Sequence, residues 1–180
     1  MEAAAHGKAP PTSKVCDAAL CEPTAAFVTL ESPDSLRGCI GTLTASAPLH
    51  QAVAEMAHAA ASRDPRFPPI VPEEISRLTI EISVLGPLQP LEDPTQLIPG
   101  KHGLIVSRGP FLGTLLPQVA THYGWGREEF IRRTCLKAGL PGDAWQRGAQ
   151  LAIFTAEVFG GPAAESETGS LQGCDHSNGV

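Results

Sequence analysis

The segment "RLTIEISVLGP", residues 77–87, constrains the fold most strongly, because its apolar and polar side chains alternate. In a strand, alternate side chains point to opposite faces of the sheet. One face would carry Leu78, Ile80, Ile82 and Val84, and the other Thr79, Glu81 and Ser83. The alternation therefore predicts a strand with one apolar face.

Other segments predict strands and helices that do not alternate strictly along the chain. Strands are expected in residues 25–32, 35–43 and 151–159, a hairpin turning at Arg108–Gly109, and helices in residues 45–62 and 127–142. In the first helix, Ser46 is placed to cap the N-terminus. This order predicts an α+β fold with a mixed or mostly antiparallel sheet and flanking helices.

Composition narrows the class of protein. Of the 180 residues, 42% are hydrophobic, the net charge is −6, and no apolar run is long enough to span a membrane. The five cysteines form no CxxC pair, which argues against a disulfide framework or a structural zinc site. No ligand set for a metal is evident, no cofactor is expected, and the lack of a basic patch makes nucleic-acid binding unlikely. We expect a soluble, cytoplasmic protein.

The two ends of the chain differ from its centre. Residues 1–21 are expected to form a flexible N-terminal segment, in which only residues 13–20 are suited to a short helix. Residues 160–180 are rich in Gly, Ser and Glu and are expected to form a disordered tail. The folded domain is therefore predicted to span residues 22–159.

Cys39 lies in "SLRGCIGTL", an apolar stretch that contains two glycines. If the stretch is a regular strand, Arg37, Cys39 and Gly41 share one face, and Arg37 could favour the thiolate form of Cys39. Gly38 and Gly41 would let a substrate or a loop approach the sulfur closely. The alternative is that Cys39 is a small buried residue without a chemical role.

Three further positions leave similar alternatives open. In "SRDPRFPP", Asp64 and Arg66 either form a salt bridge that holds the loop, with Phe67 in the core, or Arg66 binds an anionic ligand. Glu81 is either solvated, or paired with Arg37 or Arg66 and able to transfer protons. His102 is the histidine best placed to act with a thiol.

Taken in order, nine short segments resemble the AMMECR-domain family, the A component of the AmmeMemoRadiSam set. They are "FVTL", "LRGCIGTL", "DPRFPP", "EISVL", "HGL", "LPQV", "GW", "CLKAGL" and "EVF", within residues 22–159. The "LRGCIG" element is the most specific of them. Family members usually have a long amphipathic helix before the first strand, for which only residues 13–20 are available here.

The resemblance implies an α+β protein of two subdomains with the "LRGCIG" element at a cleft between them. The cleft residues it implies are Arg37, Gly38, Cys39, Gly41, Asp64, Arg66, Phe67 and Glu81. It also implies a Memo-type protein and a radical SAM protein as partners. No membrane partner is expected.

Two hypotheses for function follow. The first is a thiol-dependent enzyme acting on an unknown small molecule or peptide. Cys39 would be the nucleophile, with Arg37 poising the thiolate, Glu81 or His102 moving protons, and Arg66 orienting an anionic group. The alternative is a non-enzymatic binding or regulatory module that docks the two partners.

Overall fold

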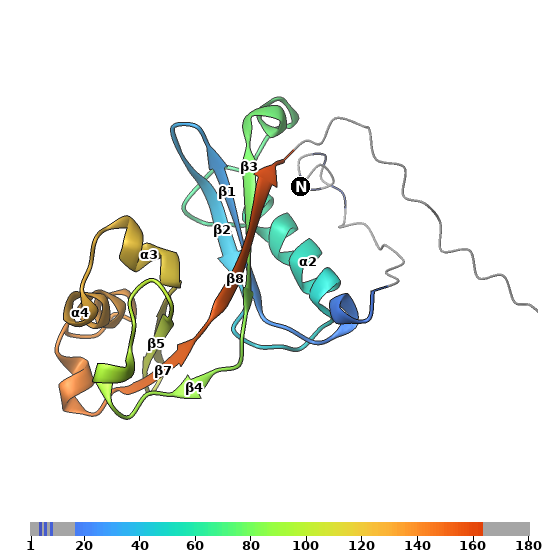
Figure 1. Ribbon diagram of the computed structural model, residues 1–180. Helices are drawn as coiled ribbons and strands as arrows, with labels where there is room; N and C mark the ends of the chain where they lie inside the picture. The colour runs from blue at the N-terminus through green and yellow to red at the C-terminus, as the bar shows by residue number, and fades with distance from the viewer. Residues whose placement is uncertain (1–3, 5, 7, 9–16, 164–180) are drawn as a thin grey trace, which may run out of the picture. The chain divides into compact units, whose positions relative to one another are not determined.

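The computed structural model describes Ala4, His6, Lys8 and residues 17–163, which belong to two compact units (Figure 1). The first unit consists of Met1–Ser83 and Val158–Val180, and the second of Val84–Glu157. The second unit is thus inserted, in sequence, into the first. Two antiparallel four-stranded sheets and several helices make up the described residues, so the predicted α+β class is confirmed.

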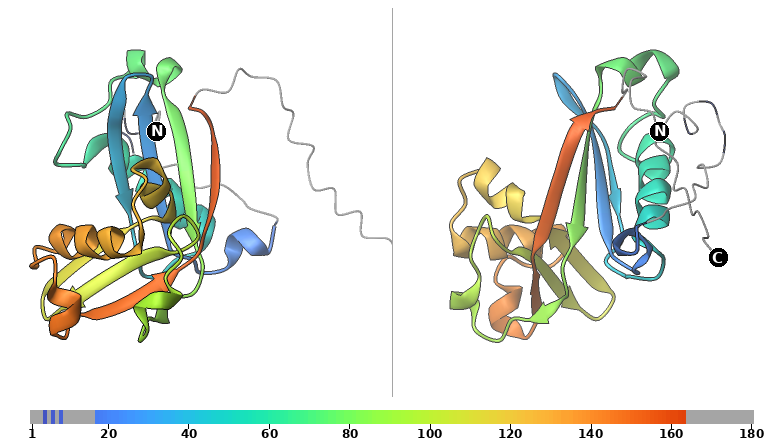
Figure 2. Two further views of the ribbon diagram at one scale, coloured as in Figure 1. Left: turned by 60° about the vertical axis from the view of Figure 1, so that its left-hand side comes forward. Right: turned by 45° about the vertical axis from the view of Figure 1, so that its right-hand side comes forward.

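The first unit is built on a sheet with the strand order β2-β1-β3-β8. Its elements are η1 (Ala19–Cys21), β1 (Ala26–Ser32), β2 (Ser35–Gly41), α2 (Leu49–Ser62), η2 (Pro72–Arg77), β3 (Thr79–Leu85) and β8 (Ala156–Pro162). Helix α2 runs along one face of this sheet, against β1 and β2 (Figure 2).

Small side chains on α2 allow the helix to lie close to the sheet. Its buried residues are Ala52, Ala57, Ala59, Ala60 and Ala61. They pack against Val28 and Leu30 of β1 and against Ile75 and Leu78. Ala4, from the N-terminal segment, is buried in the same cluster. Ile80 and Ile82 of β3 also pack on this cluster, as their alternation predicts.

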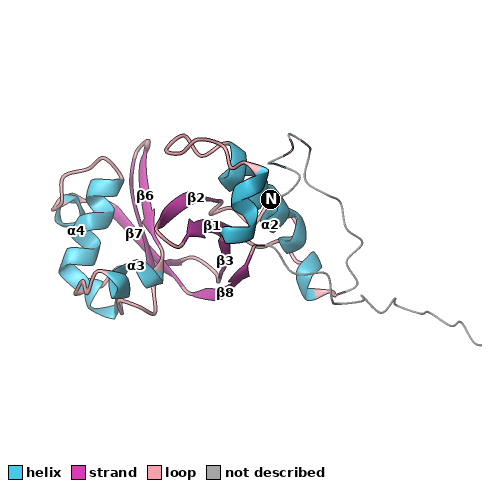
Figure 3. Cartoon of the chain, turned by 90° about the horizontal axis from the view of Figure 1, so that it is seen from above, coloured by secondary structure: helices cyan, strands magenta, loops and turns pink. Residues whose placement is uncertain are grey.

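The second unit has its own sheet, with the strand order β4-β7-β5-β6, and its own helices (Figure 3). Its elements are β4 (Gln89–Pro90), η3 (Pro94–Gln96), β5 (Gly103–Arg108), β6 (Phe111–Leu115), α3 (Pro117–His122), α4 (Arg127–Lys137), η4 (Ala144–Arg147) and β7 (Gln150–Phe154). Phe130, Ile131 and Cys135 of α4 are buried against this sheet. Cys135 is a core residue, and burial raises the pKa of its thiol.

Several element boundaries differ from those predicted; for example, α4 ends at Lys137 rather than at residue 142. Residues 151–159 form two strands rather than one, because β7 ends at Phe154 and β8 begins at Ala156 in the other sheet. β8 continues to Pro162, beyond the predicted end of the domain at Phe159. Helix α2 begins at Leu49 after Pro48, so Ser46 does not cap it.

Several predictions fall on residues that the structure does not describe. The first half of the possible short helix, residues 13–16, and residues 164–180 of the predicted tail are among these. Within the described part of the chain, no helix is long and apolar enough to cross a membrane.

Candidate functional site

Cys39 lies on β2, the edge strand of the first sheet, and is half-buried. It is paired with Thr29 of the neighbouring strand. At the end of this ladder the Thr42 N–H donates to the Ala26 carbonyl at 3.0 Å. Hydrogen-bonded and non-hydrogen-bonded pairs alternate along an antiparallel ladder. Three pairs further on, Cys39 therefore directs its own N–H and C=O away from β1, toward the open edge of the sheet.

Asp64 and Arg66 bind both of these backbone groups, and we term the two side chains the clamp. The Cys39 N–H donates to Asp64 Oδ2 at 2.9 Å, and Arg66 Nη2 donates to the Cys39 carbonyl at 3.0 Å. Within the clamp, Arg66 Nε and Nη2 donate to the two carboxylate oxygens at 2.9 and 2.7 Å. An acceptor and a donor side by side reproduce what a further strand would offer, so the clamp covers the sheet edge at Cys39.

The clamp is electrostatically strong because its anion is buried. The Asp64 side chain is 2% exposed and that of Arg66 is 52% exposed. Hydrogen bonds from the Arg66 guanidinium hold the pKa of Asp64 well below its ordinary value, against the opposing effect of burial. The same hydrogen bonds raise the pKa of Arg66, and Cys39 contributes in the same direction. Asp64 is therefore ionised throughout the neutral range.

The sulfur of Cys39 has a hydrogen-bond donor of its own. Thr29 Oγ1 donates to Cys39 Sγ at 3.3 Å across the β1–β2 pair. This hydrogen bond restrains the position of the sulfur beside β1. The sulfur and the backbone of Cys39 are thus each held by polar groups.

Arg37 does not stand beside Cys39 as a regular strand would place it. Leu30 pairs with Gly38 and Glu31 with Leu36, so Arg37 is an extra residue in β2. Such a bulge interrupts the alternation of side chains. Arg37 instead donates from Nε and Nη2 to both carboxylate oxygens of Glu74 on η2, at 2.9 and 3.1 Å. The cation that contacts Cys39 is Arg66.

Gly38 and Gly41 have no free space beside them, because other atoms of the protein lie where a side chain would begin. A Cβ on Gly38 would lie 2.1 Å from the carbonyl oxygen of Ala60, in the backbone of α2. A Cβ on Gly41 would lie 2.1 Å from the ring of Phe27. Gly38 therefore permits close packing of the helix on the strand, and the space at Gly41 is taken by an aromatic side chain.

Phe67 and Glu81 are two further predicted site residues in the first unit. Phe67 is half-buried and outside the core cluster, with the Arg66 guanidinium 5.2 Å from its ring centroid. Glu81 is half-buried on β3, on the face opposite α2, which Thr29 on the neighbouring strand shares. Their predicted roles stay predictions.

His102 belongs to the second unit, just before β5. The Ile98 N–H donates to its Nδ1 at 3.3 Å, so Nε2 carries the proton of the neutral ring. Burial, together with the charge of Lys101, lowers the pKa of His102 and favours this neutral form. Its predicted action on Cys39 stays a prediction.

Two contacts at the site were not anticipated from the sequence. The contact of Thr29 could have been found by pairing the two predicted strands of residues 26–42 as an antiparallel hairpin, because this register places Thr29 opposite Cys39. No sequence signal links Glu74 to Arg37, because the contact depends on the bulge. Among the described residues, no group of three or more His, Cys, Asp or Glu side chains could hold a metal ion.

The sequence profile of the AMMECR1 family matches residues 1–159, which include the whole second unit, most of the first unit and the clamp. The chain belongs to the AMMECR1 family. A family member from Thermococcus gammatolerans is 46% identical over 151 residues, which cover 78% of this chain and 74% of that protein. One from Methanothermobacter thermautotrophicus is 48% identical over 140 residues, covering 74% of this chain and 73% of that protein.

The fold of this AMMECR1 chain is also that of a solved structure. The crystal structure of the uncharacterized protein PH0010 from Pyrococcus horikoshii superposes with a TM-score of 0.84 at 40% identity, covering 88% of this chain and 84% of that one. The predicted membership of the AMMECR-domain family and the predicted α+β fold are thereby confirmed.

Proposed function

We propose that this AMMECR1 protein is a thiol-dependent enzyme with Cys39 Sγ as its nucleophile. The observation that carries the proposal is the hydrogen bond from Thr29 Oγ1 to Sγ, at a residue whose backbone N–H and C=O are both bound by the clamp. Catalytic groups need such fixed positions, since small displacements cost large factors in rate. A residue that only fills space would need neither set of polar contacts.

The proposed step is attack by the thiolate on an electrophilic carbon of the substrate. The sulfur electron pair forms the new S–C bond, and a leaving group departs with the electron pair of the bond that breaks. Glu81, in the same unit as Cys39, takes the thiol proton. The exposed part of the Arg66 guanidinium is suited to an anionic group on the substrate. We further propose a small molecule or peptide as substrate, in concert with a Memo-type and a radical SAM partner.

The test compares alkylation rates of two cysteines within one protein. Cys21 is exposed and Cys39 is half-buried, so accessibility alone makes Cys21 react faster with iodoacetamide. We expect Cys39 to react faster at neutral pH, as followed by peptide mass mapping with Cys39→Ser to assign the signal. Thr29→Val should slow labelling of Cys39 about tenfold, the effect of one hydrogen bond to a charged group.

A matched variant separates this effect from a general change in the sheet. Thr79→Val makes the same substitution at an exposed site of the same sheet, where the hydroxyl donates to the Glu31 carbonyl. It should leave the labelling rate unchanged. A Cys39 that labels more slowly than Cys21 would refute the proposal.

A binding module is the second candidate, and one observation favours it. Gly38 and the clamp also have structural roles, since the glycine admits the backbone of α2 and the clamp covers the edge of β2. In that case Cys39→Ser should preserve association with the two partners, and Cys39 should stay unreactive. Loss of partner association on Cys39→Ser, in a folded protein, would argue against it.

A further inference from the structure

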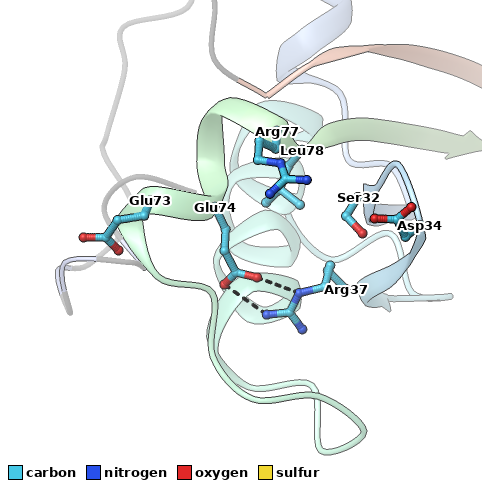
Figure 4. A pocket seen from close by; sticks show the side chains of 7 residues that line it. All are labelled: Ser32, Asp34, Arg37, Glu73, Glu74, Arg77 and Leu78. Atoms are coloured by element: carbon cyan, nitrogen blue, oxygen red, sulfur yellow. Dashed lines mark hydrogen bonds and ion pairs between the residues drawn. The ribbon is translucent and has the colours of Figure 1, made fainter.

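A separate pocket of about 340 Å³ lies in the first unit, between the β1–β2 turn and η2 (Figure 4). Ser32 and Asp34 line it on the side of the turn, and Glu74 and Arg77 on the side of η2. The buried Leu78 also lines it. Its volume is near the lower end of the range for small-molecule sites, so it suits a small ligand.

The ion pair between Arg37 and Glu74 borders this pocket as a neutral unit. The Arg37 side chain is 14% exposed, and both its Nε and Nη2 bind the carboxylate. Glu74 also accepts from the Val71 N–H at 3.0 Å. These hydrogen bonds, chiefly those from Arg37, lower the pKa of Glu74, so the pair stays ionised on both sides. Its two charges largely cancel at a distance.

Three charged side chains of the lining lie outside this pair, and two of them, Arg77 and Asp34, have opposite charges and face the pocket. Among the described residues, Arg77 forms no ion pair and the Asp34 carboxylate accepts no hydrogen bond. In Figure 4, Arg77 extends toward the Arg37–Glu74 pair, Asp34 stands on the opposite side, and Glu73 points away from the other side chains. The pocket thus presents one available cation and one available anion on opposing walls.

We propose that this pocket binds a small zwitterion, with the ligand carboxylate at Arg77 and its ammonium group at Asp34. A ligand with only a negative charge would be attracted by Arg77 but repelled by Asp34. A ligand with only a positive charge would be attracted by Asp34 but repelled by Arg77. A ligand with both charges satisfies both walls. Free amino acids and the shortest peptides have this chemistry and fit the volume. The site is separate from Cys39 and does not depend on the proposed enzyme.

The experiment titrates the uniformly ¹⁵N-labelled protein with glycine, β-alanine, γ-aminobutyrate and glycylglycine, which increase the separation of the two charges. Amide shifts are followed by NMR, with acetate and methylamine as single-charge probes. We expect at least one zwitterion to bind with a dissociation constant on the order of 1 mM, shifting the amides of residues 34 and 77. Acetate and methylamine should each bind at least about fivefold more weakly.

Variants at the two walls test the assignment. Arg77→Gln and Asp34→Asn, both at exposed positions, should each weaken zwitterion binding about fivefold. Arg63→Gln and Glu55→Gln remove exposed charges of the same unit outside the pocket and should leave it unchanged. Cys39→Ser should also bind normally, which separates this site from the thiol chemistry. Saturable binding of acetate as tight as that of the zwitterions, or shifts confined to other residues, would overturn the proposal.

Discussion

At the scale of single residues, Asp64 is the charge on which the candidate site depends. Its carboxylate is nearly inaccessible and accepts from Cys39 and from Arg66. Asp64→Asn keeps the shape but removes the charge and leaves Arg66 without its partner. Because Arg66 is half exposed and can be hydrated, we expect a loss of about 2 kcal/mol in the free energy of unfolding. Urea denaturation measures it.

The effect of Asp64 should depend on pH with a defined sign. Folding lowers the pKa of Asp64, so its contribution is complete above the unfolded value of about 3.9 and is lost as the pH falls toward the lower folded value. The stability difference between the wild type and Asp64→Asn should therefore shrink as the pH falls from 5 to 2. A difference that stays constant over this range would contradict the assignment.

How far these residues could be predicted depends on the type of contact. The Asp64–Arg66 salt bridge was one of two alternatives for "SRDPRFPP" and is present, because residues two apart in a loop readily meet. The contact of Arg37 with Glu74 was not predicted, since a bulge leaves no mark in an apolar and polar pattern. Reactivity of Cys39 depends on packing and hydration, which the sequence does not encode locally.

At the scale of elements, each unit uses one strand glycine to bring a helix against its sheet. A Cβ on Gly38 of β2 would lie 2.1 Å from the Ala60 oxygen of α2. A Cβ on Gly113 of β6 would lie 2.5 Å from the Ala138 nitrogen at the end of α4. The obstacle is backbone in both cases, so a substitution must displace a whole helix.

Gly38→Ala should therefore destabilise the protein by about 1–3 kcal/mol or more, the usual cost of an overpacked core. Gly161→Ala on β8 is the matched control, since nothing lies within 4 Å of its added Cβ. Thermal unfolding of the two variants should separate them clearly. Equal midpoints would mean that α2 and β2 adjust without cost.

The predicted elements with a clear period were found, as was the hairpin turning at Arg108–Gly109, but residues 151–159 do not form a single strand. The alternation of residues 77–87 and the helical pattern of residues 127–142 correspond to β3 and α4. "LAIFTAEVF" was predicted as one strand because its composition is uniform, yet β7 and β8 join different sheets. Which sheet a strand joins depends on distant partners, which a local pattern does not specify.

At the scale of the whole molecule, the two units have separate cores. The cluster around Phe130 in the second unit and the cluster around Val28 in the first share no residue. Native-state hydrogen exchange should therefore report each unit separately. Gly113→Ala should reduce protection in β5 and β6 more than in β1 and β2.

Gly126→Ala, in the same unit, is the control for this measurement, because its added Cβ meets nothing within 4 Å. It should leave the exchange of β5 and β6 close to that of the wild type. An equal loss of protection in both sheets of Gly113→Ala would instead show that the protein unfolds as one cooperative unit.

The insertion of the second unit into the first bears on how the protein forms during translation. Most of β3 precedes the inserted residues and most of β8 follows them, yet the two strands are neighbours in one sheet. The ribosome makes every residue of the second unit before it reaches most of β8. Multidomain chains usually fold from the N-terminus onward. Here synthesis of the second unit is complete before that of the first. Until β8 has been made, the edge of β3 that pairs with it stays unpaired.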